Sequence, residues 1–401
     1  MKKTIALLLA LLLALSVAGC AQENPAGSSG STTPTVPKEL APVFKIKSYT
    51  GTPDAVIANS DTVVATFGSA ELTNSLFQMY YWMDVYDFLN NYSDLVSSYG
   101  LDISKPLDEQ ACSGTDGTWQ HHFILNCLEG WRYYQSLALA FDESKMTMPS
   151  HLQETLDGLE EELKKDTEEG KYESIDAMIQ ADAGPGCTVE DYYSYSTLYH
   201  KAYAYFNATL DKYEITDEMI DAYFTEHEAN MAVNGITKTT GDSYKVRHIL
   251  FQVAETKTDA DWEACRQKAQ KMLDDWLAGG GSEDSFAELA KEHSEDPGSK
   301  DNGGMYNGLT DQTSFVQEFK DFYLEESRQV GDYGLVKTSY GYHIMYFSGT
   351  EPIWYYYCRE MLRDEEANRI VKEAVEKYEP VIYYDKILIG EVKLTTDTED
   401  K

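Results

Sequence analysis

Two segments of the chain alternate between apolar and polar positions with the period of a β-strand. In residues 244–251, His248 shares one face with apolar neighbours at two-residue spacing. Residues 341–347 repeat this arrangement, and His343 stands in a second apolar row. A single histidine on an apolar strand face is more often a structural group than a functional one. We therefore give weight to the pair, which predicts two strands that each present one imidazole.

The stretch between these strands predicts two helices and a loop. Apolar positions recur with helical spacing over residues 259–278, and a run of three glycines, 279–281, then ends the helix. Ser285 and Glu288 have the spacing of a capping box and predict the start of a shorter helix. Residues 294–304 follow, rich in Ser, Asp and Gly, and predict a loop.

The first half of the chain is mainly helical by its pattern. A short strand at 63–67 precedes a series of segments with apolar residues three and four apart. Thr216 has the character of an N-cap, because two acidic residues follow it in the first turn. The predicted helices span about 72–89, 119–141, 152–165, 189–213 and 217–230.

An aromatic stripe marks the helix at 189–213. It consists of Tyr192, Tyr195, Tyr199, Tyr203 and Phe206. We favour the interpretation that these residues pack against neighbouring helices. The alternative is an exposed surface for unfolded chains, since tyrosine offers a large contact area with few rotatable bonds. Beyond residue 347 the pattern predicts a helix at 360–377, a strand at 383–389 and a disordered acidic tail at 395–401.

The N-terminus has the pattern of an export signal. Two lysines precede an apolar run over residues 5–15, which is too short to cross a bilayer as a helix. Small residues stand directly before Cys20, as in the lipobox of bacterial lipoproteins, and this resemblance implies lipidation of Cys20 and stable attachment to a membrane. An ordinary secretory signal is the alternative. Residues 21–42 are rich in Gly, Ser, Thr and Pro and predict a flexible tether.

Charge and cysteine content argue against certain partners and sites. The formal net charge of −35 argues against a nucleic-acid partner, because phosphate backbones are repelled. Apart from Cys20, the chain has five cysteines, none of them in a Cys-x-x-Cys pair or at a metal-ligand spacing. We therefore expect no metal site and no disulfide framework, although a bridge between Cys112 and Cys127 stays open.

The order of motifs between the two histidines resembles the parvulin family of peptidyl-prolyl isomerases. The resemblance rests on the His-Ile-Leu strand at 248–250, the Ser-x-Asp-x-Gly-Ser loop with its Gly-Gly at 294–304, and the closing run at 336–344. It covers about a hundred residues. It implies a domain built from an antiparallel sheet with surrounding helices. Such a domain isomerises X-Pro bonds without a cofactor.

The resemblance also implies roles for particular residues. His248 and His343 would be the paired histidines, Thr338 would orient one of them, and Asp296 would face the peptide bond; the catalytic set is therefore His248, Asp296, His343 and Thr338. The implied substrate-binding residues are Phe315, Phe319, Tyr306 and Leu309.

Alternatives stay open at three places. Asp296 also stands in a composition typical of a turn, and Phe315 and Phe319, four apart on a predicted helix, could belong to the core. Parvulins usually continue the Gly-Gly with Asp-Leu-Gly, whereas this chain has Met305-Tyr306-Asn307. Lys300 is the only cation near this loop, which argues against recognition of phosphorylated Ser/Thr-Pro.

The sequence upstream is similar to the chaperone segment of PrsA-type foldase lipoproteins and of SurA-like periplasmic chaperones, on the evidence of a strand before the first helix and the helix opening at 215–223. We therefore expect an α+β protein in which a parvulin module is inserted into a mainly helical, discontinuous chaperone domain. The expected parts are a signal peptide (1–20), a tether (21–55), a helical segment (56–240), the parvulin domain (241–349), a segment completing the chaperone domain (350–394) and the tail (395–401).

These expectations lead to a lipid-anchored, extracytoplasmic isomerase that helps secreted proteins to fold. Its partners would be unfolded or partly folded secreted chains that contain X-Pro bonds. A second hypothesis is a holdase whose parvulin domain has lost useful catalysis. A third, a solute-binding lipoprotein, would require repeated alternation of strands and helices, and the long helical run before residue 230 argues against it.

Overall fold

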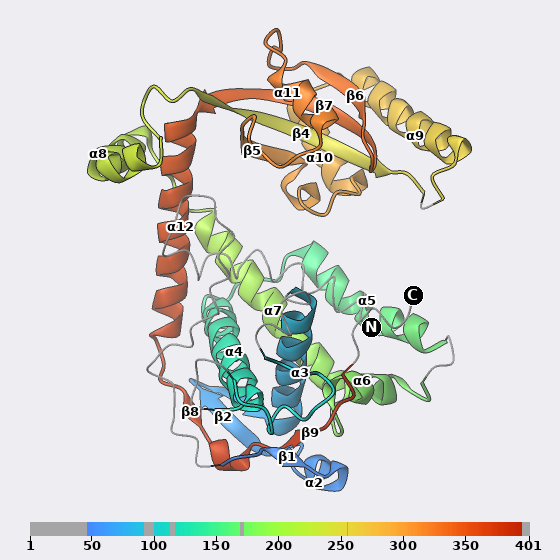
Figure 1. The fold of residues 1–401 in the computed structure, drawn as a ribbon, viewed down its shortest axis with the longest axis vertical. Coiled ribbons are helices and arrows are strands. Elements are labelled where there is room, and N and C mark those ends of the chain that lie inside the picture. The colour runs from blue at the N-terminus through green and yellow to red at the C-terminus, as the bar shows by residue number, and fades with distance from the viewer. Residues whose placement is uncertain (1–45, 92–99, 113–116, 169–171, 255, 395–401) are drawn as a thin grey trace. The chain divides into compact units, whose positions relative to one another are not determined.

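A computed structural model describes residues 46–91, 100–112, 117–168, 172–254 and 256–394 (Figure 1). Its residues divide into two compact units, one made of the chain before Ile215 together with the chain after Arg363, the other of Ile215–Arg363. The first unit is thus built from two separate stretches of sequence. Cys20, the signal peptide, most of the expected tether and the acidic tail lie outside the described residues.

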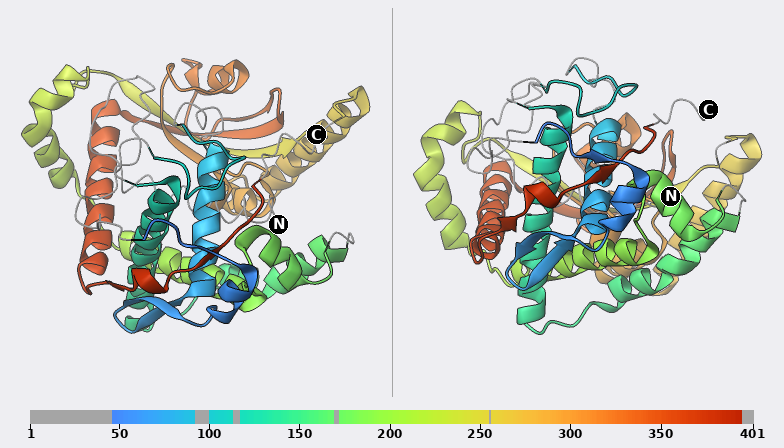
Figure 2. Two further views of the ribbon diagram at one scale, coloured as in Figure 1. Left: turned by 60° about the horizontal axis from the view of Figure 1, so that its bottom comes forward. Right: turned by 90° about the horizontal axis from the view of Figure 1, so that it is seen from below.

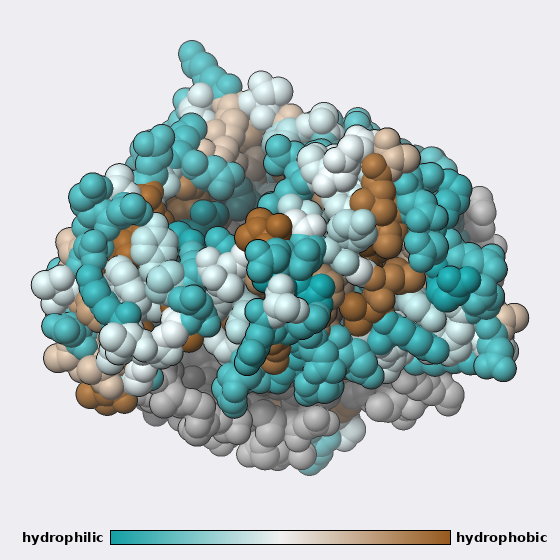
Figure 3. All heavy atoms as spheres, turned by 90° about the horizontal axis from the view of Figure 1, so that it is seen from above, coloured by the Kyte–Doolittle hydropathy of each residue, from teal (hydrophilic) through white to brown (hydrophobic). Residues whose placement is uncertain are grey.

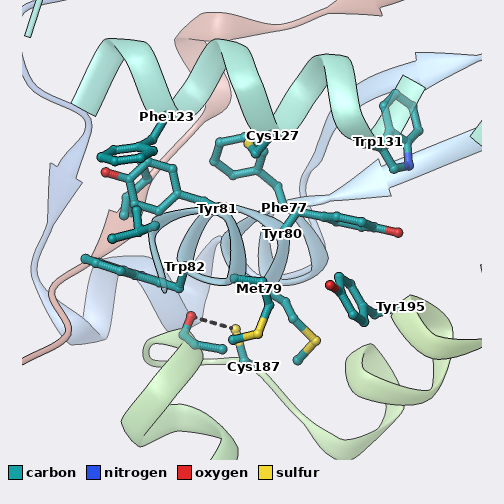
Figure 4. Packing of buried hydrophobic residues seen from close by; sticks show 14 of the residues in the cluster. Phe77, Met79, Tyr80, Tyr81, Trp82, Phe123, Cys127, Trp131, Cys187 and Tyr195 are labelled. Carbon is teal, nitrogen blue, oxygen red and sulfur yellow. Dashed lines mark hydrogen bonds between the residues drawn. The ribbon is translucent and has the colours of Figure 1, made fainter. Parts of the chain in front are cut away.

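The first unit is mainly helical. Its helices are α2 (Pro53–Ala58), α3 (Asn74–Asn91), α4 (Trp119–Glu143), α5 (Ser150–Glu168), α6 (Ile175–Ala183), α7 (Val189–Leu210) and the later part of α12 (Ile353–Val375). Helices α3 and α4 supply more residues than any other element to one large apolar core, in which Tyr81, Phe123 and Trp131 are almost fully buried (Figure 4). The predicted helices of this region are confirmed, whereas α2 and α6 were not predicted.

The aromatic stripe of α7 lies in the core. Tyr192 and Tyr195 are buried, and the ring of Tyr195 lies 4.9 Å from that of Tyr80 on α3 and 4.6 Å from that of Tyr199. These are distances at which aromatic rings attract one another. The packing interpretation of the stripe is therefore confirmed for these residues.

The two ends of the first unit meet in small sheets. Strand β1 (Thr50–Gly51) pairs in parallel with β9 (Ile389–Gly390), and the blue and red segments run side by side in Figure 2. Strand β2 (Val63–Phe67) lies between β3 (Ala70–Thr73) and β8 (Val381–Ile382). The single strand expected at 383–389 is wrong, because a 3-10 turn at Tyr384–Lys386 carries the chain from one sheet to the other. Residues 50–55, expected in the tether, belong to β1 and α2.

The second unit is organised around a four-stranded antiparallel sheet of order β5-β4-β7-β6. Its strands are β4 (Asp242–Gln252), β5 (Met305–Leu309), β6 (Tyr333–Lys337) and β7 (Gly341–Pro352). Helices α9 (Asp259–Ala278) and α10 (Glu283–His293) pack on the face that carries Ile249 and Ile344. Helix α11 (Gln317–Leu324) packs on the opposite face, around Val246 and Met345. Helix α8 (Asp217–Val233) packs against the start of α12 through Phe224 and Cys358.

The boundaries of these elements correct the sequence prediction in two places. Helix α10 begins after Ser282, whose hydroxyl accepts from the backbone of Ser285, so the cap stands three residues before the expected one. Helix α12 begins at Ile353 rather than near residue 360. The N-cap at Thr216 is confirmed, since its hydroxyl accepts from the backbone of Met219.

Three further features concern the cysteines, the surface and the helices. Cys112 and Cys127 form no disulfide. Most of the surface coloured in Figure 3 is hydrophilic, with hydrophobic residues in small patches, as a chain with 25% charged residues would lead one to expect. Within the described ranges, no helix combines the length and apolarity needed to span a membrane.

Candidate active site

The two histidines meet because of the register between β4 and β7. His248 lies opposite Met345, so His343 is its diagonal neighbour on the same face of the sheet. The two imidazole rings stack with 5.2 Å between their centroids, and their Nδ1 atoms are 3.0 Å apart. Both residues are almost completely buried, with exposed fractions of 2% and 4%. The structure thus brings the predicted pair together.

Thr338 completes one end of this arrangement. It follows the end of β6, and its backbone N–H donates to the carbonyl of Gly341, which closes the turn into β7. Its Oγ1 lies 2.9 Å from Nε2 of His343 and accepts from the backbone N–H of Tyr340. Because that oxygen already accepts one hydrogen bond, its own proton is available for the imidazole.

The contacts imply one consistent set of tautomers. If Thr338 donates to Nε2 of His343, the proton of that ring lies on Nδ1 and points at Nδ1 of His248. His248 then carries its proton on Nε2, which lies 2.9 Å from Oδ2 of Asp296. Burial and the neighbouring His248 lower the pKa of His343 to about 3, although Asp296 opposes this shift. The two rings therefore connect a hydroxyl to a carboxylate, and His343 is neutral at neutral pH.

Asp296 lies on a loop that is fastened to β4. The backbone N–H of Leu250 donates to the buried Ser294 hydroxyl, and the backbone N–H of Glu295 donates to the carbonyl of Leu250. The Ser294 oxygen also accepts from the backbone N–H of Asp296, at 3.3 Å. These bonds hold the loop against the strand that carries His248.

One oxygen of Asp296 accepts three hydrogen bonds. Its Oδ2 accepts from His248 Nε2 at 2.9 Å, from Ser299 Oγ at 2.5 Å and from Tyr306 Oη at 3.0 Å. Burial alone would raise the pKa of Asp296, but these donors outweigh it and hold the pKa well below its ordinary value. The group is therefore a carboxylate at neutral pH, and its side chain is 18% exposed.

The Gly-Gly of this loop allows the backbone to approach β4. The backbone N–H of His248 donates to the carbonyl of Gly304 at 2.8 Å. A Cβ on Gly304 would lie 2.2 Å from the carbonyl oxygen of His248, and the φ of +76° is one that favours glycine. Close contact with β4 therefore requires glycine here.

Aromatic rings surround the polar network. The ring of Phe319, on α11, meets those of His248 and His343 edge-on at 5.2 and 5.5 Å. Phe315 lies 4.9 Å from both Phe319 and Tyr306. The prediction that Phe315 and Phe319 share a helix is wrong, because α11 begins at Gln317 and Phe315 lies in the loop before it.

Leu309 lies in the same apolar cluster as Tyr306, Phe315 and Phe319. It ends β5, pairs with Tyr244 and is 97% buried in the core under α11, at an exposed fraction of 3%. Its exposed fraction equals that of Phe319, so burial does not distinguish these two residues. The structure thus brings the predicted site residues together around one polar network and one apolar cluster.

Burial separates the residues that could touch a peptide from those that support them. The histidines, Thr338 and Phe319 are buried, whereas Asp296, Tyr306 and Phe315 are partly exposed. A peptide placed here would meet the carboxylate and two aromatic rings, with the imidazoles behind them. Two serines of the network, Ser294 and Ser299, received no role from the sequence, although both stand in the Ser-x-Asp-x-Gly-Ser motif that suggested the loop.

Comparison with known proteins agrees with this region of the fold. Residues 231–349 match the model of the PPIC-type PPIASE domain. A stretch of 104 residues is 38% identical to Chaperone SurA of Pseudomonas fluorescens and covers 26% of this chain and 22% of that protein. A stretch of 179 residues is 31% identical to Foldase protein PrsA of Caldanaerobacter subterraneus subsp. tengcongensis and covers 43% and 48% of the two chains. The matched stretches thus span from about a fifth to about half of these relatives.

Among solved structures, PrsA from Bacillus subtilis is similar at 19% identity and a TM-score of 0.32, over 67% of this chain and 90% of that one. PrsA from Bacillus cereus is similar at 18% identity and a TM-score of 0.21, over 79% and 90%.

Proposed function

We propose that this chain, which carries a PPIC-type parvulin domain and is homologous to the SurA and PrsA foldases, isomerises X-Pro bonds in unfolded or partly folded secreted proteins. One observation carries the proposal. A buried relay from Thr338 through His343 and His248 ends at a partly exposed carboxylate, Asp296, beside an aromatic surface. The aromatic rings can pack against a pyrrolidine ring, and the carboxylate can lie beside the carbonyl oxygen of the X-Pro peptide bond.

The chemistry follows from the electronic structure of the amide. Resonance places partial negative charge on the carbonyl oxygen, and twisting the C–N bond removes that charge at a cost of roughly 18 to 20 kcal/mol. A fixed carboxylate near the carbonyl oxygen repels the planar form more than the twisted one. It therefore lowers the barrier between cis and trans, and each ~1.4 kcal/mol of this difference gives about a tenfold increase in rate.

The relay keeps the carboxylate in the form that this mechanism needs. Three donors stabilise the charge on Asp296, and His343 and Thr338 hold one of these donors, His248, in place. Asp296 is accordingly the catalytic residue, since it can touch the substrate. His248, His343 and Thr338 are positioning residues, because they are buried. Tyr306 and Phe315, which are partly exposed, form the surface for the proline ring, and the buried Phe319 packs against both.

The proposed setting is outside the cytoplasm, with the chain attached to the cell membrane through lipidated Cys20. The support is the N-terminal sequence: a basic start, a short apolar run and small residues before the cysteine. Replacement of Cys20 by Ala tests this part. The wild-type chain should incorporate labelled fatty acid and sediment with membranes, whereas the variant should do neither. Equal labelling of both chains would contradict it.

A refolding experiment distinguishes the isomerase from the alternative, a holdase. The test substrate is a denatured protein whose slow refolding phase is limited by proline isomerisation. The full chain should accelerate that phase, and Asp296→Asn should abolish the acceleration while leaving suppression of aggregation intact. The holdase is favoured if the wild-type chain prevents aggregation without any change in the slow rate. The departure from the usual parvulin sequence after the Gly-Gly, at Met305-Tyr306-Asn307, motivates this alternative.

A further inference from the structure

Tyr306 joins the polar and aromatic halves of the site. Its hydroxyl lies 3.0 Å from Oδ2 of Asp296, and its ring centroid lies 4.9 Å from that of Phe315 and 5.4 Å from that of His248. Burial and the charge of Asp296 raise the pKa of Tyr306 to about 12. The phenol therefore keeps its proton and remains a donor at any pH at which the protein works.

The loop is built to leave room for this hydroxyl. A Cβ on Gly298 would lie 2.6 Å from Oη of Tyr306, closer than non-bonded atoms approach. Gly298 does not have a positive φ, so its conformation alone does not call for glycine. The absence of a side chain at Gly298 thus leaves the space that the hydroxyl of Tyr306 occupies.

The hydroxyl also bears on the orientation of the carboxylate. Every side-chain hydrogen bond that Asp296 accepts within the described chain goes to Oδ2, from His248, Ser299 and Tyr306. His248 and Ser299 come from the strand and the loop, and Tyr306 comes from β5. Donors from separate elements fix the rotation of the carboxylate and leave Oδ1 for another partner.

We propose that Tyr306 is a positioning residue of the isomerase site: its hydroxyl, admitted by Gly298, holds Asp296 in the orientation in which Oδ1 meets the substrate. This inference rests on the proposed function, which it deepens. It separates two tasks of one side chain, since the ring contacts the proline while the hydroxyl controls the catalytic group.

The first test is kinetic and uses the full chain with an X-Pro peptide. Tyr306→Phe keeps the ring and removes the hydroxyl, so kcat should fall about tenfold, as for the loss of a hydrogen bond to a charged acceptor, with KM unchanged. Gly298→Ala should displace the hydroxyl and cause a similar loss. The double variant should lose no more than either single variant, because both remove the same contact. Tyr333→Phe, on a half-exposed residue of β6, is the matched control and should keep wild-type kcat.

If the wild-type chain is active, these kinetic measurements decide whether Tyr306 positions Asp296. An unchanged kcat in Tyr306→Phe, or a rise in KM alone, would overturn the inference, since the residue would then be dispensable or only a binding contact. Losses that multiply in the double variant would also overturn it, because Gly298 and Tyr306 would then act separately.

A second test needs no activity. Urea unfolding should show a lower midpoint for Tyr306→Phe than for the wild type, but no difference between Asp296→Ala and Asp296→Ala/Tyr306→Phe, where the acceptor is already gone. Equal effects in both backgrounds would overturn the inference. If the wild-type chain proves inactive, the proposed function fails, and this measurement still decides whether Tyr306 holds Asp296.

Discussion

Removal of the Thr338 hydroxyl should disable the site without touching any residue that meets the substrate. Thr338→Val keeps the shape of the side chain but takes away the donor to Nε2 of His343, 2.9 Å away. The side chain is 3% exposed, so water cannot readily replace the donor. A buried acceptor left without a partner costs about 1 to 3 kcal/mol, and we expect a loss of about 2 kcal/mol in the free energy of unfolding.

The effect on catalysis follows from the order of protons in the relay. Without the Thr338 hydroxyl, no donor to Nε2 of His343 favours the tautomer whose proton lies on Nδ1 and points at His248. If that proton moves to Nε2, two nitrogen lone pairs face each other at 3.0 Å, unless His248 also changes tautomer and turns a lone pair towards Asp296. Each of these two rearrangements contains one repulsive contact, and a His343 that keeps its proton on Nδ1 is left with an unpaired Nε2. We therefore expect kcat/KM to fall by about tenfold or more, which corresponds to ~1.4 kcal/mol.

The assay is the cis-to-trans rate of an X-Pro peptide with the full chain, paired with urea unfolding. Thr338→Ser is the matched control, because it keeps the hydroxyl and should retain most of the activity. The reasoning is refuted if Thr338→Val retains wild-type kcat/KM, or if the serine variant loses as much as the valine variant.

Three further predictions concern the loop and the pH dependence. Ser299→Ala removes one of the three donors to Asp296 and should lower kcat/KM several-fold with little change in KM, measured with the same peptide; an unchanged rate would mean that Ser299 only closes the loop. Gly304→Ala would force a Cβ to within 2.2 Å of the His248 carbonyl at a φ of +76° and should cost about 3 kcal/mol or more in urea unfolding; wild-type stability would contradict the close approach. The pKa of His343 is about 3 in the folded chain against about 6.5 unfolded, so the unfolded chain binds the extra proton, and stability should be full above pH 6.5 and decline as pH falls towards 3. The urea midpoint of His343→Asn should decline less over this pH range than that of the wild type. An equal decline in both would refute the assignment of the pH dependence to His343.

The site was predictable where it depends on periodic elements. A period of two places His248 and His343 each on one face of a strand, and antiparallel pairing of neighbouring strands brings such faces together. Residues 259–278 form α9 with the predicted bounds, because the apolar period runs from a capping box at Thr258 to the glycines at 279–281. Asp296 and Thr338 required the resemblance to parvulins, since neither has a period of its own.

Other features depend on geometry that no local pattern encodes. The strand expected at 383–389 breaks because its two ends pair with different partners, β2 and β1, far away in the sequence. Phe315 reaches the site from a loop because the backbone of Val316 is extended and starts α11 only afterwards. The bond from Tyr306 to Asp296 depends on space at Gly298, and spacing along the chain does not reveal such space.

The central claim is that Asp296 lowers the barrier to rotation about an X-Pro bond. Exchange NMR tests it most directly, by following magnetisation transfer between the cis and trans signals of a proline peptide in the presence of a small amount of the full chain. The account predicts exchange peaks with the wild-type chain and their loss with Asp296→Asn, whose fold is checked by circular dichroism. Exchange of equal rate with a folded Asp296→Asn chain, or none with the wild-type chain, would contradict it.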